Sequence, residues 1–368
     1  MITKIALQNL KCFGSRAEFP MSQITLLYGK NGRGKSTLAQ SLLILSQTIL
    51  SEGSPEVLQL NGRQINLGFV SDVLNINNGN ENIIIDISTD MKGCEEMHLE
   101  YEDDNNQRLL LSKMVVDGIN RFEEFEDTTG KRGNSFRLGT TSDIALLEQL
   151  KDLAYVSADR MSLGEAENVV PESRLLPSGK NMLGVLIAQN SEFLNNIQEA
   201  LSFILSGATV DLKRVDNRVE LRLNSLDNDD TYRVQNVGFG YSYVLPIIVS
   251  TLLAKKDSIL VIENPEAHLH TAAQSRIMEF LVEQAKKKNL QLIVETHSDH
   301  VINGMRIAVR KSESLLSASD CGILYFDYAK SQKGLSLVEP IRVNEQGHLS
   351  SYPDDFMDEW TKQMMELL

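Results

Sequence analysis

The stretch Gly29–Ser36 limits what this chain can fold into more than any other part of the sequence. It reads Gly-Lys-Asn-Gly-Arg-Gly-Lys-Ser and fits the pattern G-x-x-x-x-G-K-[ST]. The apolar run Ile24–Tyr28 precedes it, and a segment with helical character, Thr37–Leu50, follows it. A strand, a glycine-rich turn and a helix in this order predict a phosphate-binding loop.

The residue types in this stretch suit a bound triphosphate and its Mg²⁺. Backbone N–H groups can wrap phosphates only where the chain curls closely, and the glycines permit that. We expect Lys35 to reach the β and γ phosphates and the Ser36 hydroxyl to bind Mg²⁺, with the positive end of the helix dipole directed at the anion. The predicted ATP-binding residues are Asn31, Gly32, Arg33, Gly34, Lys35, Ser36 and Thr37.

Composition narrows the class of protein. With 42% hydrophobic residues, the chain has enough apolar side chains for a large core. The net charge of −14 argues against a broad electrostatic contact with nucleic acid, but it leaves a local DNA contact open. Cys12, Cys94 and Cys321 stand far apart, and no apolar run approaches a membrane span. We therefore expect a reduced, cytoplasmic protein without membrane contact.

Alternating apolar residues and short connections predict an antiparallel sheet in the first part of the chain. The expected strands are Ile2–Leu10, Gln64–Phe69, Asn82–Thr89, Met97–Tyr101 and Arg108–Val116. Residues 126–142 are polar and contain glycines, so we expect them to form an exposed loop.

The rest of the chain has a different pattern. Apolar residues at helical spacing predict helices at Ile144–Leu153 and Asn181–Ser206, within a mostly helical lobe that carries a small β insertion. The last third then alternates helix and strand, with an expected helix at Thr271–Lys288. Its apolar runs are typical of strands buried on both faces of a parallel sheet, namely Ser258–Ile262, Leu290–Val294 and Ile323–Phe326.

Polar residues follow two of these buried strands. Glu263, Asn264 and Glu266 come directly after the first, at the point where P-loop enzymes place the carboxylate that holds Mg²⁺. We expect Glu263 to bind Mg²⁺ and Glu266 to orient an attacking water; a solvated acidic turn is the alternative. His297 follows the next strand and could donate a hydrogen bond to a γ-phosphate, although a lone histidine is more often structural.

A second glycine-rich turn, Gly238-Phe239-Gly240, opens a predicted helix near Tyr241. Backbone N–H groups at a helix N-terminus can hold an anion, so Gly238, Phe239 and Gly240 are a second candidate phosphate cradle. A plain turn explains the same residues equally well.

In their order along the chain, these motifs resemble an ABC-type ATPase of the SMC, RecF and OLD kind. More closely, they resemble the compact ATPases of prokaryotic anti-phage defence loci, such as the ATPase subunits of the Septu and PARIS systems. The stretches that carry the resemblance are Ile5–Phe13, the phosphate-binding loop, Tyr155–Arg160, the Gly238 turn, Glu263–His270, Thr296–Ser298 and the tail Tyr352–Glu359.

The resemblance implies a fold and a set of roles. The fold is α/β, a P-loop NTPase of ABC-ATPase type with a mixed sheet core, an antiparallel β subdomain and a helical lobe. One domain spans residues 1–368, with the P-loop and antiparallel β part in 1–142. The helical lobe with the signature turn takes 143–245, and the Walker B, D-loop and switch-histidine part takes 246–368.

The resemblance also assigns the site residues. Glu263 falls on the magnesium-binding acid, Ala267–His270 on the D-loop and His297 on the switch histidine. Gly238–Tyr241 falls on the signature, which in that family caps the γ-phosphate of the opposite subunit. A homodimer or higher oligomer with shared ATP sites is implied, and with it a partner effector such as a nuclease.

Two residues depart from the family pattern. Asn264 stands at the position where the general base is expected, and it is the third candidate catalytic residue beside Glu266 and His297. An amide cannot accept a proton as a carboxylate does. Gly238 replaces the signature serine. Either Glu266 takes over the role of the base or ATP hydrolysis is slow, and both changes favour an ATP-gated switch. The alternatives are a non-hydrolysing scaffold that ATP locks together and a RecF-like DNA-repair ATPase.

Overall fold

The chain divides into two compact units in the computed structural model. The first comprises Met1–Leu153, Asp257–Ile259 and Leu324–Pro340, and the second Ala154–Lys256, Leu260–Ile323 and Ile341–Leu368. The structure describes residues 1–77, 82–104, 107–126, 132–136, 141–160, 165–167, 169–215, 218–224, 230–311, 317–328 and 336–368.

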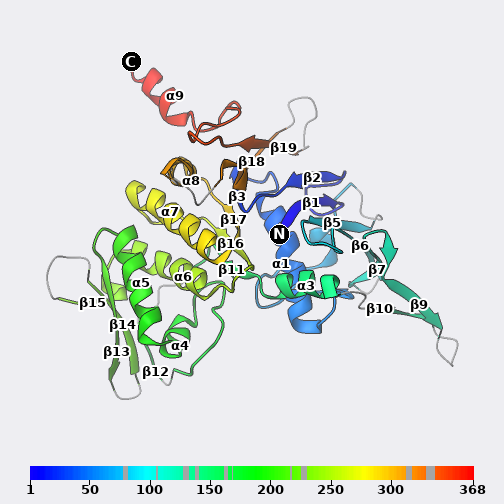
Figure 1. The fold of residues 1–368 in the computed structure, drawn as a ribbon, viewed down its shortest axis with the longest axis horizontal. Coiled ribbons are helices and arrows are strands. Elements are labelled where there is room, and N and C mark those ends of the chain that lie inside the picture. Colours follow the sequence, from blue (N-terminus) through cyan, green and yellow to red (C-terminus); the bar gives the residue numbers. More distant parts are fainter. Residues whose placement is uncertain are drawn as a thin grey trace. The chain divides into compact units, whose positions relative to one another are not determined.

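An antiparallel sheet dominates the first unit, with strand order β2-β1-β5-β6-β7-β4 and β8 paired to β7 (Figure 1). Residues of β5 are buried in strict alternation, as expected when one face of a sheet packs on a core. The strands are β1 Ile2–Gln8, β2 Ala17–Pro20, β4 Val57–Leu58, β5 Ile83–Thr89, β6 Glu96–Asp103, β7 Leu109–Val116 and β8 Ile119–Asn120. The predicted antiparallel part is therefore confirmed, with one strand placed wrongly.

The phosphate-loop segment of the first unit joins β3 (Ile24–Gly29) to α1 (Lys35–Glu52). Most side chains of α1 are buried, and Gly53 ends the helix in a left-handed conformation. Strand β18 (Cys321–Tyr328) lies beside β3, and β19 (Ser336–Arg342) lies beside β18. The remaining helices of this unit are α2 Val70–Val73 and α3 Thr141–Lys151.

Two sequence predictions in this unit are wrong. Gln64–Phe69 is not a strand: it pairs with the residues just before it through a single bridge between Asn66 and Asn61, and the Ile65 N–H donates to the side chain of Gln47 on α1. The segment 126–142 is not simply a loop. Strands β9 (Phe122–Glu126) and β10 (Arg132–Phe136) form a hairpin, and α3 already begins at Thr141. Antiparallel pairing satisfies the backbone of a polar segment as well as that of an apolar one, so polarity alone misled the prediction. Residues 127–131 and 137–140 lie outside the described part of the chain.

The second unit contains three adjacent strands in the order β11-β16-β17. Strand β11 (Ala154–Val156) is parallel to β16 (Ile259–Glu263), with Tyr155 opposite Val261. Every residue of β17 (Gln291–Glu295) is buried. The predicted buried strands after residues 257 and 289 are confirmed, and α7 covers Thr271–Lys288 as predicted. The helices of this unit are α4 Met182–Ile187, α5 Ser191–Ile204, α6 Phe239–Leu253, α7, α8 Asp299–Lys311 and α9 Glu359–Glu366.

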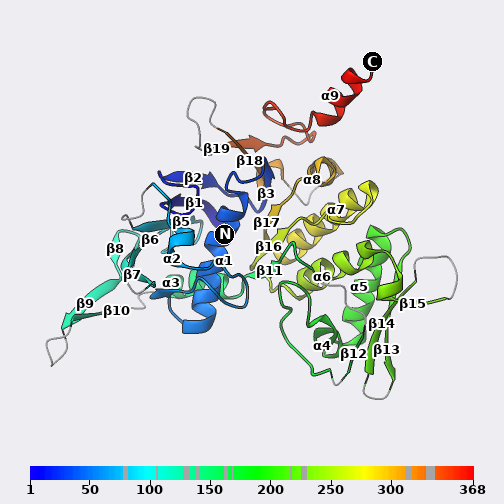
Figure 2. The same ribbon diagram turned by 180° about the vertical axis from the view of Figure 1, so that it is seen from behind.

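A small antiparallel sheet accompanies these helices, in the order β12-β14-β13 with β15 paired to β14 (Figure 2). Leu221 and Leu223 of β14 are buried, so one face of this sheet belongs to the core. Its strands are β12 Glu165–Glu167, β13 Thr209–Val215, β14 Arg218–Asn224 and β15 Tyr232–Arg233, and short 3-10 turns lie at Val234–Asn236 and Ala318–Asp320. Within the described residues, no helix combines the length and the apolar character needed to cross a bilayer.

Candidate functional site

Three glycines determine the path of the phosphate-loop segment in the first unit. Gly29, Gly32 and Gly34 have φ angles of 129°, 68° and 103°, a region that L side chains rarely adopt. A Cβ atom at Gly29 would lie 2.2 Å from the Phe326 carbonyl oxygen, and one at Gly34 would lie 2.3 Å from Cζ of Phe13. The backbone is therefore packed closely at both ends of the loop, where only glycine fits.

The middle of the loop is open. A Cβ at Gly32 would meet no atom within 4 Å, and both Asn31 and Gly32 are exposed. The α1 helix begins immediately afterwards with Gly34 as its N-cap, so no side chain of the cap residue covers the first N–H groups of the helix. An exposed glycine turn on a helix N-terminus is the geometry that accepts an anion.

Lys35 is held inside the loop. Its side chain is only 3% exposed, and Nζ donates hydrogen bonds to the carbonyl oxygens of Gly29 and Lys30, each at 2.8 Å. The ammonium is therefore held within the loop by the loop's own carbonyls. Ser36 is half-buried, and buried Thr37 has its hydroxyl oxygen 3.8 Å from Sγ of Cys12.

The other two cations of the loop contact the end of β18. Lys30 Nζ lies 2.9 Å from Oδ1 of Asp327, and the guanidinium carbon of Arg33 lies 3.6 Å from the centre of the Tyr328 ring. The Lys30 N–H also donates to the Phe326 carbonyl oxygen at 2.9 Å. Sequence reasoning missed Asp327 and Tyr328, because nothing in a strand pattern shows which loop its end will meet.

In the second unit, Glu263 ends β16 and points its carboxylate at the loop that follows β11. Oε2 accepts a hydrogen bond from the Ala158 N–H at 3.1 Å. The Tyr155 hydroxyl also bonds to this carboxylate, and burial, followed by the Glu263 charge, raises the pKa of Tyr155. Both neighbours orient the acid. Neither was assigned a role from the sequence, although both lie in the Tyr155–Arg160 stretch that carries the family resemblance.

Asn264 turns the chain sharply after the strand. Its φ of 45° is left-handed, its N–H donates to the Glu295 carbonyl oxygen at 2.8 Å, and its own carbonyl oxygen accepts from Nη2 of Arg160 at 2.6 Å. The side-chain oxygen Oδ1 is buried and has no hydrogen-bond partner among the described residues. An acceptor without a partner at this position can bind a water or another donor.

Glu266 and His297 are brought together by the fold, although they stand 31 positions apart. Glu266 Oε1 accepts from the His297 N–H and Oε2 accepts from the Thr296 hydroxyl, both at 2.8 Å. Each carboxylate oxygen keeps a second lone pair. Glu266 therefore holds the segment that carries His297, and His297 remains exposed.

The second glycine turn opens α6, as the sequence predicted, but the helix begins at Phe239 and Gly238 is its N-cap. Only the backbone of Phe239 is described. Gly240 faces the Ala267–His270 stretch, because a Cβ there would lie 2.9 Å from the His268 carbonyl oxygen. The centres of the Tyr243 and His268 rings are 4.3 Å apart. The start of α6 is thus packed directly on His268.

The predicted site residues form two groups, one in each unit. Residues 31–37 form the loop of the first unit, and the second unit brings together Glu263, Asn264, Glu266 and His297 with the start of α6. Sequence reasoning assigned no role to Arg160, the last residue of the Tyr155–Arg160 stretch, which bonds to the Glu263 and Asn264 carbonyl oxygens. A buried arginine leaves no local pattern.

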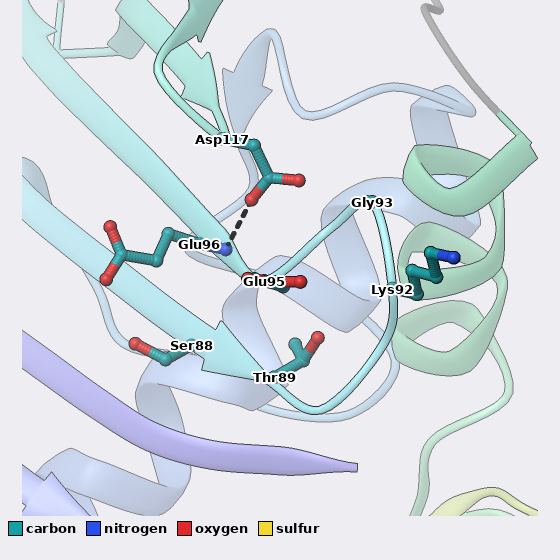
Figure 3. Close-up of a pocket in the computed structure, with 7 residues that line it drawn as sticks. All are labelled: Ser88, Thr89, Lys92, Gly93, Glu95, Glu96 and Asp117. Atoms are coloured by element: carbon teal, nitrogen blue, oxygen red, sulfur yellow. Dashed lines mark hydrogen bonds between the residues drawn. The ribbon is translucent and has the colours of Figure 1, made fainter.

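A polar hollow elsewhere in the first unit shares no residue with either group (Figure 3). It lies at the turn between β5 and β6, where Oδ1 of Asp117 accepts a hydrogen bond from the Glu96 N–H at 2.8 Å. Its lining residues are Ser88, Thr89, Lys92, Gly93, Glu95, Glu96 and Asp117. None of the sequence motifs falls there.

Comparison with known proteins defines the class. The family described as "AAA domain, putative AbiEii toxin, Type IV TA system" matches residues 24–303, and this chain belongs to that family of AAA-domain proteins. A family of unknown function, DUF3696, matches residues 316–367, which include the tail Tyr352–Glu359. No curated protein matches the chain.

Solved structures show the same fold at low identity. The chain is similar to an SMC head bound to the C-winged helix domain of ScpA, with a TM-score of 0.56 and 15% identity over 93% of this chain and 97% of that one. It is also similar to an SMC head from Pyrococcus furiosus bound to the C-terminal domain of ScpA, with a TM-score of 0.50 and 12% identity over 100% of this chain and 99% of that one. The predicted α/β fold of ABC-ATPase type is confirmed.

Proposed function

We propose that this chain is an ABC-type ATPase that binds Mg²⁺ and ATP and hydrolyses ATP slowly. The observation that carries the proposal is the loop before α1, in which three positive-φ glycines surround a buried Lys35 at a helix N-terminus. Asn31–Thr37 would hold the phosphates through backbone N–H groups, and Lys35 would exchange its two carbonyl partners for phosphate oxygens.

Two oxygen donors suit Mg²⁺, namely the Ser36 hydroxyl and the Glu263 carboxylate. Within the described residues, no cluster of three or more His, Cys, Asp or Glu could hold a metal on its own. Mg²⁺ that is shared with a nucleotide needs no such cluster, because phosphates and water supply its other ligands. When bound, the ion would neutralise phosphate charge.

The catalytic roles go to Glu266, Asn264 and His297. The spare lone pairs of Glu266 and the unpartnered Oδ1 of Asn264 are acceptors that could orient an attacking water. Asn264 cannot take the proton, so turnover should be slow. His297, whose position Glu266 fixes, would donate to the γ-phosphate.

The start of α6 supports the proposal of a dimer. Gly238, Phe239 and Gly240 present the N-terminus of a long helix, and in ABC-type ATPases this turn caps the nucleotide of a second copy. A homodimer, or a higher oligomer, with two shared ATP sites would follow. This assignment rests on the family resemblance and the helix geometry together.

The biological role rests on the resemblance alone. We propose that ATP occupancy gates a partner effector, most simply a nuclease, in prokaryotic anti-phage defence, and that the protein acts in the cytoplasm. The test is a phage challenge of cells that carry the native locus with either wild-type protein or Lys35→Ala. Equal phage growth in both would count against the defence role.

The first experiment uses the purified wild-type chain. We expect ATP binding by calorimetry, slow phosphate release with Mg²⁺ that stops when EDTA removes the metal, and an ATP-dependent rise in mass by light scattering. Absence of ATP binding would overturn the proposal. Tight binding without turnover would favour the non-hydrolysing scaffold.

The RecF-like DNA-repair ATPase is distinguished by DNA binding. It predicts strong binding to double-stranded DNA with a steep salt dependence, since phosphate contacts release counterions. The net charge of −14 makes the opposite result the expected one.

A further inference from the structure

Arg160 is buried to 2% exposure, and none of the roles assigned above uses it. Taking a charged group out of water is unfavourable unless hydrogen bonds and nearby charges compensate for the lost hydration. A buried arginine beside a proposed active site therefore calls for a specific explanation.

The guanidinium of Arg160 holds the end of β16 by its backbone. Nη1 donates to the carbonyl oxygen of Glu263 at 2.7 Å and to that of Ser157 at 2.9 Å, and Nη2 donates to that of Asn264 at 2.6 Å. The first and third acceptors belong to consecutive residues, so one planar fork spans the peptide where the chain turns. Lysine could not reproduce this geometry.

The charge of Arg160 is kept at neutral pH. Burial lowers its pKa to about 10, and the neighbouring carboxylates of Glu266 and Glu263 oppose that shift. Since this pKa lies well above 7, the group stays a cation among acids. Its attraction to these carboxylates partly offsets the cost of burial.

The same cation connects the turn to α6. The Cζ atom of Arg160 lies 5.4 Å from the centre of the Tyr243 ring, and the centre of that ring lies 4.3 Å from the centre of the His268 ring. Tyr243 therefore lies against both the Arg160 side chain and the His268 ring. A shift at the start of α6 would therefore change the contacts of both Arg160 and His268.

We propose that Arg160 is a positioning residue that fixes the Glu263–Asn264 turn and that Tyr243 links this turn to the start of α6. The inference rests on the proposed function, because the direction of the Glu263 carboxylate matters only if it holds the metal of a bound nucleotide. Without the fork, Glu263 and Asn264 would lose the hydrogen bonds that set their backbone.

The test measures metal affinity as well as turnover. Mn²⁺ binding to the full chain saturated with ATP is followed by electron paramagnetic resonance in wild type, Arg160→Lys and Arg160→Ala. We expect Arg160→Ala to weaken Mn²⁺ binding and to lower kcat by roughly tenfold each, as loss of groups that orient a metal ligand usually does. Arg160→Lys should recover only part of both, and the Kd for ATP without metal should not change.

Lys288 supplies a matched control. It is also a partly buried cation whose Nζ donates to three backbone carbonyl oxygens, those of Thr251, Leu252 and Ala254 at the end of α6. Lys288→Ala should lower the Tm without changing Mn²⁺ affinity or kcat. A merely structural Arg160 would behave in the same way as this control, which would overturn the proposal.

The outcomes separate the two proposals. Wild-type protein that binds no Mn²⁺ in the presence of ATP would overturn the proposed function and the inference with it. Tight Mn²⁺ binding that Arg160→Ala leaves unchanged would overturn the inference alone. If Arg160→Ala does not fold, Arg160→Lys and Tyr243→Ala decide, and wild-type Mn²⁺ affinity in both would contradict the proposal.

Discussion

The loop Gly29–Ser36 and the turn Glu263–Leu269 are built by different means. The loop is stabilised largely by local contacts, because Lys35 donates to carbonyl oxygens only five and six positions before it and the glycines supply the backbone angles, although the Lys30 N–H also donates to the Phe326 carbonyl oxygen of β18. The turn is held by distant side chains. Arg160 bonds to Glu263 across 103 positions, and Glu266 bonds to His297 across 31.

This difference determines how each region should respond to mutation. A conformation that depends on unusual backbone angles is disrupted when a side chain is added, whereas a conformation that depends on long-range hydrogen bonds is disrupted when a side chain is removed. Substitutions in the two regions test that contrast.

Lys35→Ala should have the largest effect. Removal of the buried ammonium takes away a charge-assisted contact to phosphate, so we expect the Kd for ATP to rise at least roughly 100-fold, or about 2.8 kcal/mol. Isothermal titration calorimetry measures it. Lys113→Ala is the control, because that ammonium is exposed and pairs with Glu100 at 3.0 Å. An unchanged Kd in Lys35→Ala would show that the loop is not the nucleotide site.

Gly29→Ala and Gly32→Ala compare two positions of the same loop. Both require positive φ, but only a Cβ at Gly29 meets backbone, 2.2 Å from an oxygen atom. We expect Gly29→Ala to lower the free energy of unfolding by about 2 kcal/mol more than Gly32→Ala, in the range of overpacking costs. Chemical denaturation gives the comparison. Equal losses would mean that the close packing at Gly29 relaxes freely.

Glu266→Gln tests the turn. The amide offers one acceptor oxygen where the carboxylate offers two, so either the His297 N–H or the Thr296 hydroxyl must lose its acceptor. We expect kcat to fall roughly tenfold, about 1.4 kcal/mol, while the Kd for ATP stays the same. Glu279→Gln, which alters the ion pair between Glu279 on α7 and Lys311 on α8, serves as the control. A raised Kd with normal kcat would contradict the assigned role.

Asn264→Asp should have the smallest effect and the opposite sign. It places a carboxylate where ABC-type ATPases have a base, so we expect kcat to rise roughly fivefold, within the range that a positioned base contributes. The gain is limited because the new charge lies near Glu263 and Glu266. Steady-state phosphate release measures it. A loss of activity would indicate that the amide itself is needed at this position.

Sequence reasoning predicted the elements around the loop well because their signals are local. Burial alternates along β5 and β6 and, apart from an interruption at Ser112–Lys113, along β7, and α7 has its predicted limits, since periodicity and end signals lie within each segment. The prediction of a strand at Gln64–Phe69 was wrong, because the Ile65 N–H donates to the Gln47 side chain and not to a neighbouring strand. Sequence reasoning also failed for the hairpin β9–β10, whose polar residues resemble a loop.

The residue pattern of Gly29–Ser36 is sufficient to predict a glycine loop carrying Lys35 between a strand and a helix, because positive φ angles and close packing select glycine at fixed positions. The fold was needed to show that Arg160 holds Glu263 and Asn264, that Glu266 holds the His297 segment, and that Tyr243 contacts His268. These contacts depend on how β11, β16, β17 and α6 align, and no local pattern encodes an alignment between residues so far apart in the chain.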